Sequence, residues 1–150
     1  MMWSAVVVVH VGGERLDPDH LLAKHAPGKV TSYRKGEPAP RGRTHKISGL
    51  KIDLGEVTSK QALEELILTH FKDHAALYRD VAAAGGQVSL GVGLMVPSKE
   101  PRTATLRADV LRVLSETRVT LHVTGYPCMD EESEEEAGQQ QDAADEPLLE

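Results

Sequence analysis

The stretch VSLGVGL at residues 88–94 decides the fold, because aliphatic residues alternate in it with serine and glycine. Successive side chains of a β-strand point to opposite faces of its sheet, so this pattern indicates a strand with one aliphatic face. The segments at residues 47–54 and 119–124 alternate in the same way. Together they predict a sheet that packs one face under helices and leaves the other open.

The open face predicted in this way gathers polar and small residues from three segments. They are Lys51, Asp53, Ser89, Gly91, Gly93, Thr120, His122 and Thr124. Such a face is either solvated or a platform for a partner. Because glycine weakens a strand, Gly91 and Gly93 indicate close approach of another group, a bulge or a crossing segment.

Two further strands are expected before residue 47. The β-branched run at residues 3–11 lacks strong alternation and predicts a central strand covered on both faces. Residues 29–34 predict a short strand, and the glycines and prolines that follow indicate a loop.

Helices are expected after Asp17, Thr58 and Thr105, each acting as an N-cap. The pattern after Thr58 continues to Gly85, which is long for this domain at about 1.5 Å per residue, so a break is expected near residues 72–74. The expected fold is α+β, with the order β-α-β-β-α-β-α-β and a mainly antiparallel sheet with helices on one face.

Charge divides the chain into two parts. The formal net charge of −6 comes from 17 Lys and Arg against 23 Asp and Glu. Ten of the acids and no base lie in residues 130–150, so the remaining 13 acids and 17 bases give residues 1–129 a net charge of +4. We expect a single α+β domain at residues 1–128 and a disordered acidic tail at residues 129–150. The tail either solvates the terminus or folds back over a basic surface and competes with an anionic ligand.

Composition excludes several classes of protein. The single cysteine, Cys128, allows no intramolecular disulfide and no cysteine-rich zinc site. The longest apolar run, residues 5–9, is too short to span a bilayer, and no base precedes it as in a secretory signal. We expect a cytoplasmic protein that does not interact with membranes.

A basic segment is the main candidate for binding. Six basic or histidine side chains occur within residues 34–46, opposed only by Glu37. A loop of this kind is solvated, contacts an acidic protein surface or binds nucleic acid. With two residues of the open face, the candidates for partner or anion binding are Arg34, Lys35, Arg41, Arg43, Lys46, Lys51 and His122.

No catalytic set is recognisable in the sequence. His70 and His74 have the i, i+4 spacing of two metal ligands, but no third ligand accompanies them, so they are a weak candidate pair and no metal site is expected. Serine and cysteine lack the motifs of nucleophilic catalysis, and Gly91 and Gly93 are not followed by the rest of a dinucleotide fingerprint. We expect no cofactor.

Three short motifs resemble a bacterial family, the domain of unknown function 4279. They are LDPDHLL at residues 16–22, SYRKGE at residues 32–37 and KISGL at residues 46–50, within a similarity over about residues 5–124. Members of that family often have a tryptophan where this chain has Leu50. The resemblance implies no established activity or catalytic residues, and it suggests an interaction or immunity-type protein.

Three functions therefore remain open. The preferred one is a non-enzymatic bacterial protein-interaction domain, of the immunity type or a regulatory partner of another protein. The alternative is anion or nucleic-acid binding through the loop at residues 34–46. The third is a small enzyme with its site on the polar sheet face.

Overall fold

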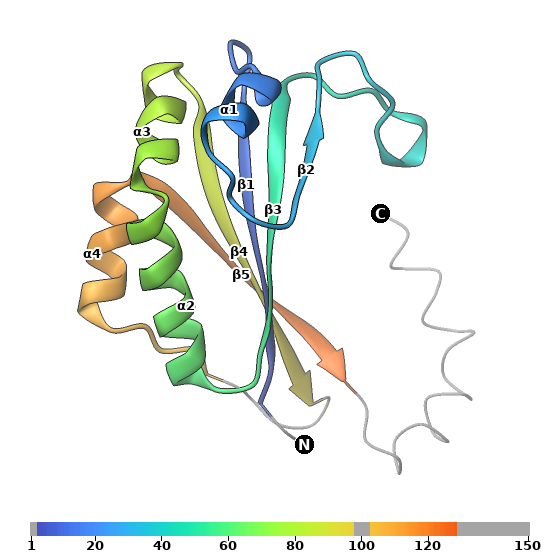
Figure 1. Cartoon of the computed structure of the whole chain (residues 1–150). Helices are drawn as coiled ribbons and strands as arrows, with labels where there is room; N and C mark the ends of the chain where they lie inside the picture. The colour runs from blue at the N-terminus through green and yellow to red at the C-terminus, as the bar shows by residue number, and fades with distance from the viewer. Residues whose placement is uncertain (1–2, 98–102, 129–150) are drawn as a thin grey trace, which may run out of the picture.

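One mixed sheet forms the centre of the molecule. The computed structural model describes residues 3–97 and 103–128 (Figure 1). The strands are β1 (Ala5–Gly13), β2 (Val30–Tyr33), β3 (Ser48–Val57), β4 (Gln87–Pro97) and β5 (Val119–Cys128), in the order β2-β3-β1-β4-β5. All neighbouring pairs are antiparallel except β4 and β5, which are parallel. The predicted α+β class with a mainly antiparallel sheet is confirmed.

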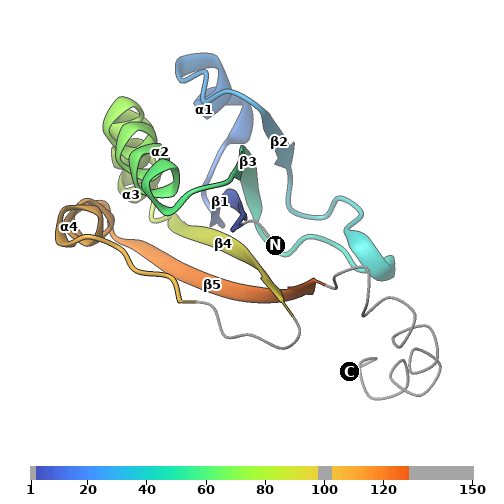
Figure 2. The ribbon, with the colours of Figure 1, turned by 90° about the horizontal axis from the view of Figure 1, so that it is seen from below.

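The helices cover one face of this sheet (Figures 1 and 2). They are α1 (Pro18–Lys24), α2 (Lys60–Asp73), α3 (Ala75–Ala83) and α4 (Ala108–Glu116), and a short 3₁₀ turn, η1, spans Pro40–Gly42. None of the described helices is both long and apolar enough to cross a bilayer. The acidic tail predicted at residues 129–150 lies outside the described residues.

The helix boundaries follow the predicted caps in part. Asp17 caps α1 as expected, since its carboxylate accepts a hydrogen bond from the His20 N–H. The caps predicted at Thr58 and Thr105 are wrong. The Ser59 hydroxyl accepts from the Ala62 N–H at 3.1 Å and so begins α2, and α4 begins after Arg107 without a side-chain cap. The predicted break of the long helix is confirmed at His74, which separates α2 from α3.

The hydrophobic core lies between the helices and the sheet. Central strands contribute every second residue to it, including Val9, Ile52 and Leu90, all fully buried. The expectation that β1 is covered on both faces is wrong. β1 is central, but only its odd-numbered residues from Ala5 to Val11 are buried, while Val6 and Val8 are half-buried and His10 is exposed. Its other face therefore lies on the open side of the sheet.

Candidate functional site

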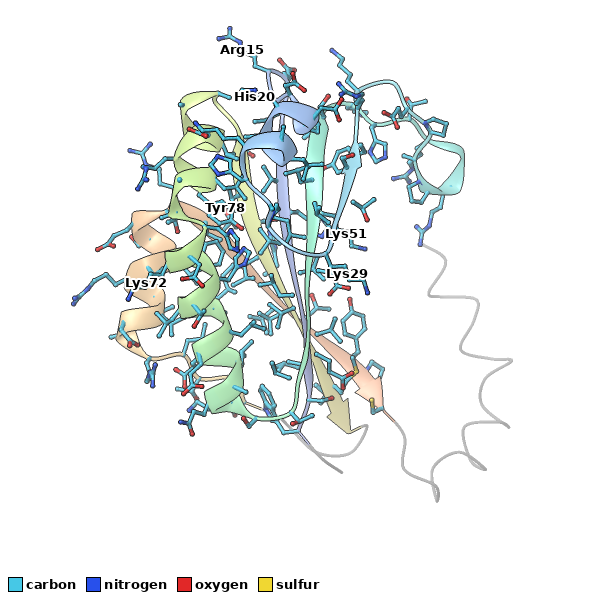
Figure 3. All side chains as sticks on the ribbon, in the orientation of Figure 1. Arg15, His20, Lys29, Lys51, Lys72 and Tyr78 are labelled. Carbon is cyan, nitrogen blue, oxygen red and sulfur yellow. The ribbon has the colours of Figure 1, made fainter. Side chains whose placement is uncertain are left out.

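The open face, which is the sheet face without helices, is the candidate site. Strand register places His10 on β1 between Lys51 on β3 and Ser89 on β4, with Thr120 beyond Ser89 on β5. In the next row Val8 lies between Asp53 and Gly91, and His122 follows on β5. The residues predicted for the polar face share this surface, and Lys51 points away from the helices in Figure 3.

The two strand glycines have different surroundings. A Cβ at Gly93 would lie 2.7 Å from the Tyr126 ring, so the aromatic side chain of β5 covers this position. Gly91 has only the Val8 carbonyl oxygen nearby, at 3.6 Å from a Cβ. The close approach expected from the sequence is therefore made at Gly93 by the chain itself, while Gly91 leaves a flat, open area beside His122.

A polar hollow of about 640 Å³ occupies one end of the open face. Its lining includes His10, Tyr33, Ile47, Ser89, Arg118 and His122, and no carboxylate among the residues that the structure describes. The pKa of His10 is lowered by partial burial and then by the positive charges of Lys51 and His122. The imidazole of His10 is thus held in its neutral form, and an anion bound beside it would counter the charges that disfavour protonation.

An apolar hollow of about 380 Å³ adjoins the polar one. Its lining includes Val6, Val8, Gly91, Met95, Thr124 and Tyr126. His10 lines both hollows, and Lys51 lies at the rim of the apolar one. The open face thus joins an apolar hollow that has Lys51 in its lining to a polar hollow lined by Arg118, His10 and His122.

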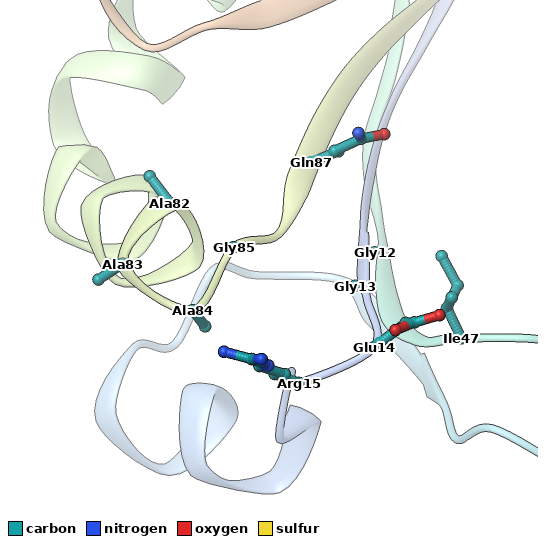
Figure 4. A pocket seen from close by; sticks show the side chains of 10 residues that line it. All are labelled: Gly12, Gly13, Glu14, Arg15, Ile47, Ala82, Ala83, Ala84, Gly85 and Gln87. Atoms are coloured by element: carbon teal, nitrogen blue, oxygen red, sulfur yellow. The ribbon is translucent and has the colours of Figure 1, made fainter.

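A third hollow, of about 630 Å³, lies where β1 ends near the end of α3 (Figure 4). Glycine and alanine make up most of its lining. Arg15 extends toward Ala84 at the carboxyl end of α3, where a cation is favoured by the helix dipole. The helix dipole thus explains the position of Arg15, and this hollow does not indicate a ligand.

The basic loop at residues 34–46 is anchored to the open face by an aromatic stack. The rings of Tyr33 and His45 are stacked with centroids 4.3 Å apart. Tyr33 lies over Gly49, where a Cβ would overlap both the Tyr33 hydroxyl and the Val11 carbonyl oxygen. Ile47 likewise covers Gly12. Tyr33 and Ile47, which flank the loop, therefore line one end of the polar hollow.

The basic side chains of this loop do not form a single cluster of available charges. Arg34 makes an ion pair with Asp19 on α1, and its guanidinium lies 3.9 Å from the Asp17 carboxylate. Lys35 donates its backbone N–H to the Ser48 hydroxyl at 3.0 Å. Arg41, with a φ of 62°, and Arg43 belong to the turn around η1, and both are exposed. Lys46 is also exposed, near the return to β3.

His70 lies on α2 and His74 lies between α2 and α3, and the surroundings of His70 are structural. His70 is buried, and its Nε2 lies 2.6 Å from the Tyr78 hydroxyl on α3. This contact occupies one of the two nitrogens that could bind a metal. Within residues 3–97 and 103–128, no group of three or more His, Cys, Asp or Glu side chains could hold a metal ion.

Sequence reasoning missed several residues of the open face. Val6 and Val8 were hidden in an unbroken apolar run, and Arg118 precedes a strand whose register was unknown. Tyr126 was detectable, because it continues the alternation of His122 and Thr124 by one further step.

No protein-family model, curated protein or solved structure matches the chain. The similarity to the domain of unknown function 4279 stays a prediction.

Proposed function

We propose that this chain is a non-enzymatic protein-interaction domain that binds another protein on its open face. The observation that carries the proposal is the junction of an apolar hollow, which has Lys51 in its lining, with a polar hollow lined by Arg118, His10 and His122 and by no carboxylate among the described residues. Interfaces combine an apolar anchor with charged groups that orient the partner. The partner would place an apolar or aromatic side chain near Val8 and Tyr126, and an acidic group near Lys51 and Arg118.

The family resemblance supports the same class of function. It suggests a cytoplasmic bacterial protein of the immunity or regulatory type, whose partner is a second protein. An acidic patch on that partner fits both the open face and the exposed bases of the loop at residues 34–46.

The arrangement of the histidines favours binding over catalysis. A histidine that serves as a base is normally oriented by a carboxylate and lies beside a nucleophile. Among the described residues, neither His10 nor His122 hydrogen-bonds to a carboxylate, and Asp53 is instead 3.7 Å from Lys29. The open face therefore provides complementary surface without an oriented catalytic group.

Charge reversal at matched positions tests the proposal. Lys51 is exposed on the open face, and Lys72 is exposed on α2 on the opposite side of the molecule. A partner captured from bacterial cytoplasm by the wild-type chain is purified and titrated against Lys51→Glu, Tyr126→Ala and Lys72→Glu. We expect the first two variants to weaken binding at least about tenfold, as at interface hot spots, and the third to bind normally.

Two results would count against this site. Equal binding by all variants, or equal loss in Lys72→Glu, places the interface elsewhere.

The alternative, nucleic-acid binding by the loop, predicts a different pattern. Fluorescence anisotropy with a single-stranded RNA would then show salt-dependent binding that Arg41→Glu with Arg43→Glu abolishes and Tyr126→Ala does not.

A further inference from the structure

One edge of β5 pairs with no other strand of the described residues. The strand lies at the end of the sheet (Figure 2), pairs with β4 along its whole length, and no other described strand pairs with it. A strand edge presents N–H and C=O groups that can pair with another chain. Proteins usually protect such edges by making them short or charged.

The two edges of this sheet differ in that protection. β2 has only four residues and lies between Lys29 and Arg34. β5 has ten residues and contains no Lys, Arg, Asp or Glu. Because β5 is long and carries no charged side chain of these types, its outer edge can pair with another strand.

Exposed apolar side chains gather beside this edge. Among the described residues, four large hydrophobic side chains are exposed, and three of them lie on β5 or on α4 next to it. They are Leu111, Val123 and Tyr126, which are 49%, 49% and 51% exposed. An edge that is unpaired, uncharged and apolar is typical of a surface covered in an assembly.

We propose that β5 pairs with β5 of a second copy of this chain, antiparallel about a two-fold axis perpendicular to the sheet. The two five-stranded sheets then join into one continuous sheet. Residues directly opposite each other must lie on the same face, so the axis passes midway between one residue and its own copy. Centring on Val123 pairs residues 119–127 throughout, whereas centring on His122 would place two imidazoles against each other.

This register brings favourable neighbours together. Val123 meets its own copy on the helix side, and His122 meets Thr124 on the open side. Cys128 lies opposite Arg118 of the second copy.

The size of the edge suits a weak dimer. A strand of ten residues is about 33 Å long, and the sheet with its helix layer presents an edge about 15–20 Å high. The contact would bury on the order of 500–650 Å² per copy, or about 1,000–1,300 Å² in total. That total is at the lower end of specific interfaces, so we expect a dissociation constant in the micromolar range.

Sedimentation equilibrium of the full chain tests the dimer, over about 1 to 200 µM at physiological salt. We expect the wild type to dimerise and Val123→Lys to raise the dissociation constant at least about 100-fold, because two like charges would face each other across the axis. Thr31→Lys on β2 is the matched control, since Thr31 is an exposed residue of the opposite edge strand, and it should leave the dimer unchanged. A monomer at all concentrations, or a dimer that Val123→Lys does not weaken, overturns the proposal.

A cross-link tests the same register with a substitution that does not need to disrupt the dimer. In a Cys128→Ser background, Val123→Cys should form a disulfide between copies under mild oxidation, because opposite residues of antiparallel strands have Cβ atoms close enough for the bond. Thr31→Cys in the same background should not. Equal cross-linking of both variants, or none at position 123, contradicts the β5 register. Dimerisation can be measured without the partner protein, so its outcome does not depend on the proposed function.

Discussion

The two faces of the sheet are built from neighbouring residues and have opposite properties. Val9, Ile52 and Leu90 are fully buried under the helices, whereas His10, Lys51 and Ser89, each adjacent to one of them in the chain, lie on the open face. One face therefore holds the fold together, and the other is available for recognition. Substitutions at two neighbouring residues of a strand should therefore differ in effect. The one at the buried residue should mainly lower stability, and the one at the exposed residue should mainly weaken binding.

The strongest test of this contrast compares Ile52→Ala with Lys51→Ala. Removing a fully buried Ile side chain leaves a cavity, so we expect the free energy of unfolding to fall by about 3–4 kcal/mol. Truncating an exposed lysine should change it by less than about 0.5 kcal/mol.

Urea unfolding followed by circular dichroism measures both values for this pair. A large loss in Lys51→Ala would show that the open face contributes to the core. Partner binding should respond in the opposite order, with Lys51→Ala impaired and Ile52→Ala normal wherever it remains folded.

A smaller difference is expected between two glycines of the sheet. At Gly49 a Cβ would overlap the Val11 carbonyl oxygen, which belongs to a paired strand and cannot move aside easily. We expect Gly49→Ala to cost about 2 kcal/mol, in the range of overpacked sites. At Gly91 the nearest atom is 3.6 Å from a Cβ, so alanine fits and should stabilise the strand by about 0.5 kcal/mol.

Thermal melting of both alanine variants distinguishes the two positions. If Gly91→Ala destabilises the protein as much as Gly49→Ala, then the area beside His122 is not open. Gly91→Ala also fills part of the apolar hollow with a methyl group, so it sharpens the contrast between stability and binding at a single position.

The faces were predictable from the sequence where alternation is clear. Leu50 and Ile52 on β3, and Leu90 and Val92 on β4, are buried on the side expected from their period of two. The same rule failed for β1, because the apolar half of the open face uses Val6 and Val8. A strand with apolar residues on both sides has no alternation, whether its second face is covered by a helix or only half-exposed.

The composition of the site depended on contacts that local sequence does not encode. Arg118 lies just before β5 and lines the polar hollow, because β5 pairs in parallel with β4, which links residues about 30 positions apart. Arg34 was expected to belong to a basic cluster, but its ion pair is with Asp19 on α1, a different element. Local charge density predicted a basic loop, and tertiary packing determined which of its charges are paired within the chain.

The last comparison concerns the histidines of the two sides. His70 on the helix side lies 2.6 Å from the Tyr78 hydroxyl. Burial lowers the pKa of His70 to about 4, helped by the charge of His74 and opposed by that of Asp73. The same burial raises the pKa of Tyr78, so both groups are neutral near pH 7.

Because the pKa of His70 is lower in the folded state, the unfolded chain binds its proton first as the pH falls. The free energy of unfolding should therefore be highest above about pH 6.5 and should decline between about pH 6.5 and 4. Tyr78→Phe removes the hydroxyl partner and should cost about 1 kcal/mol at pH 7.

Urea titrations at several pH values follow this decline in the wild type, in His70→Gln and in the open-face variant His10→Gln. We expect the decline to flatten most in His70→Gln, because that variant has no imidazole to protonate in the unfolded chain. His10→Gln should flatten it less, since the pKa of His10 is lowered by only partial burial and by the charges of Lys51 and His122. A flattening that is larger in His10→Gln would place the main pH-sensitive contact on the open face and reverse the division of roles between the two sides.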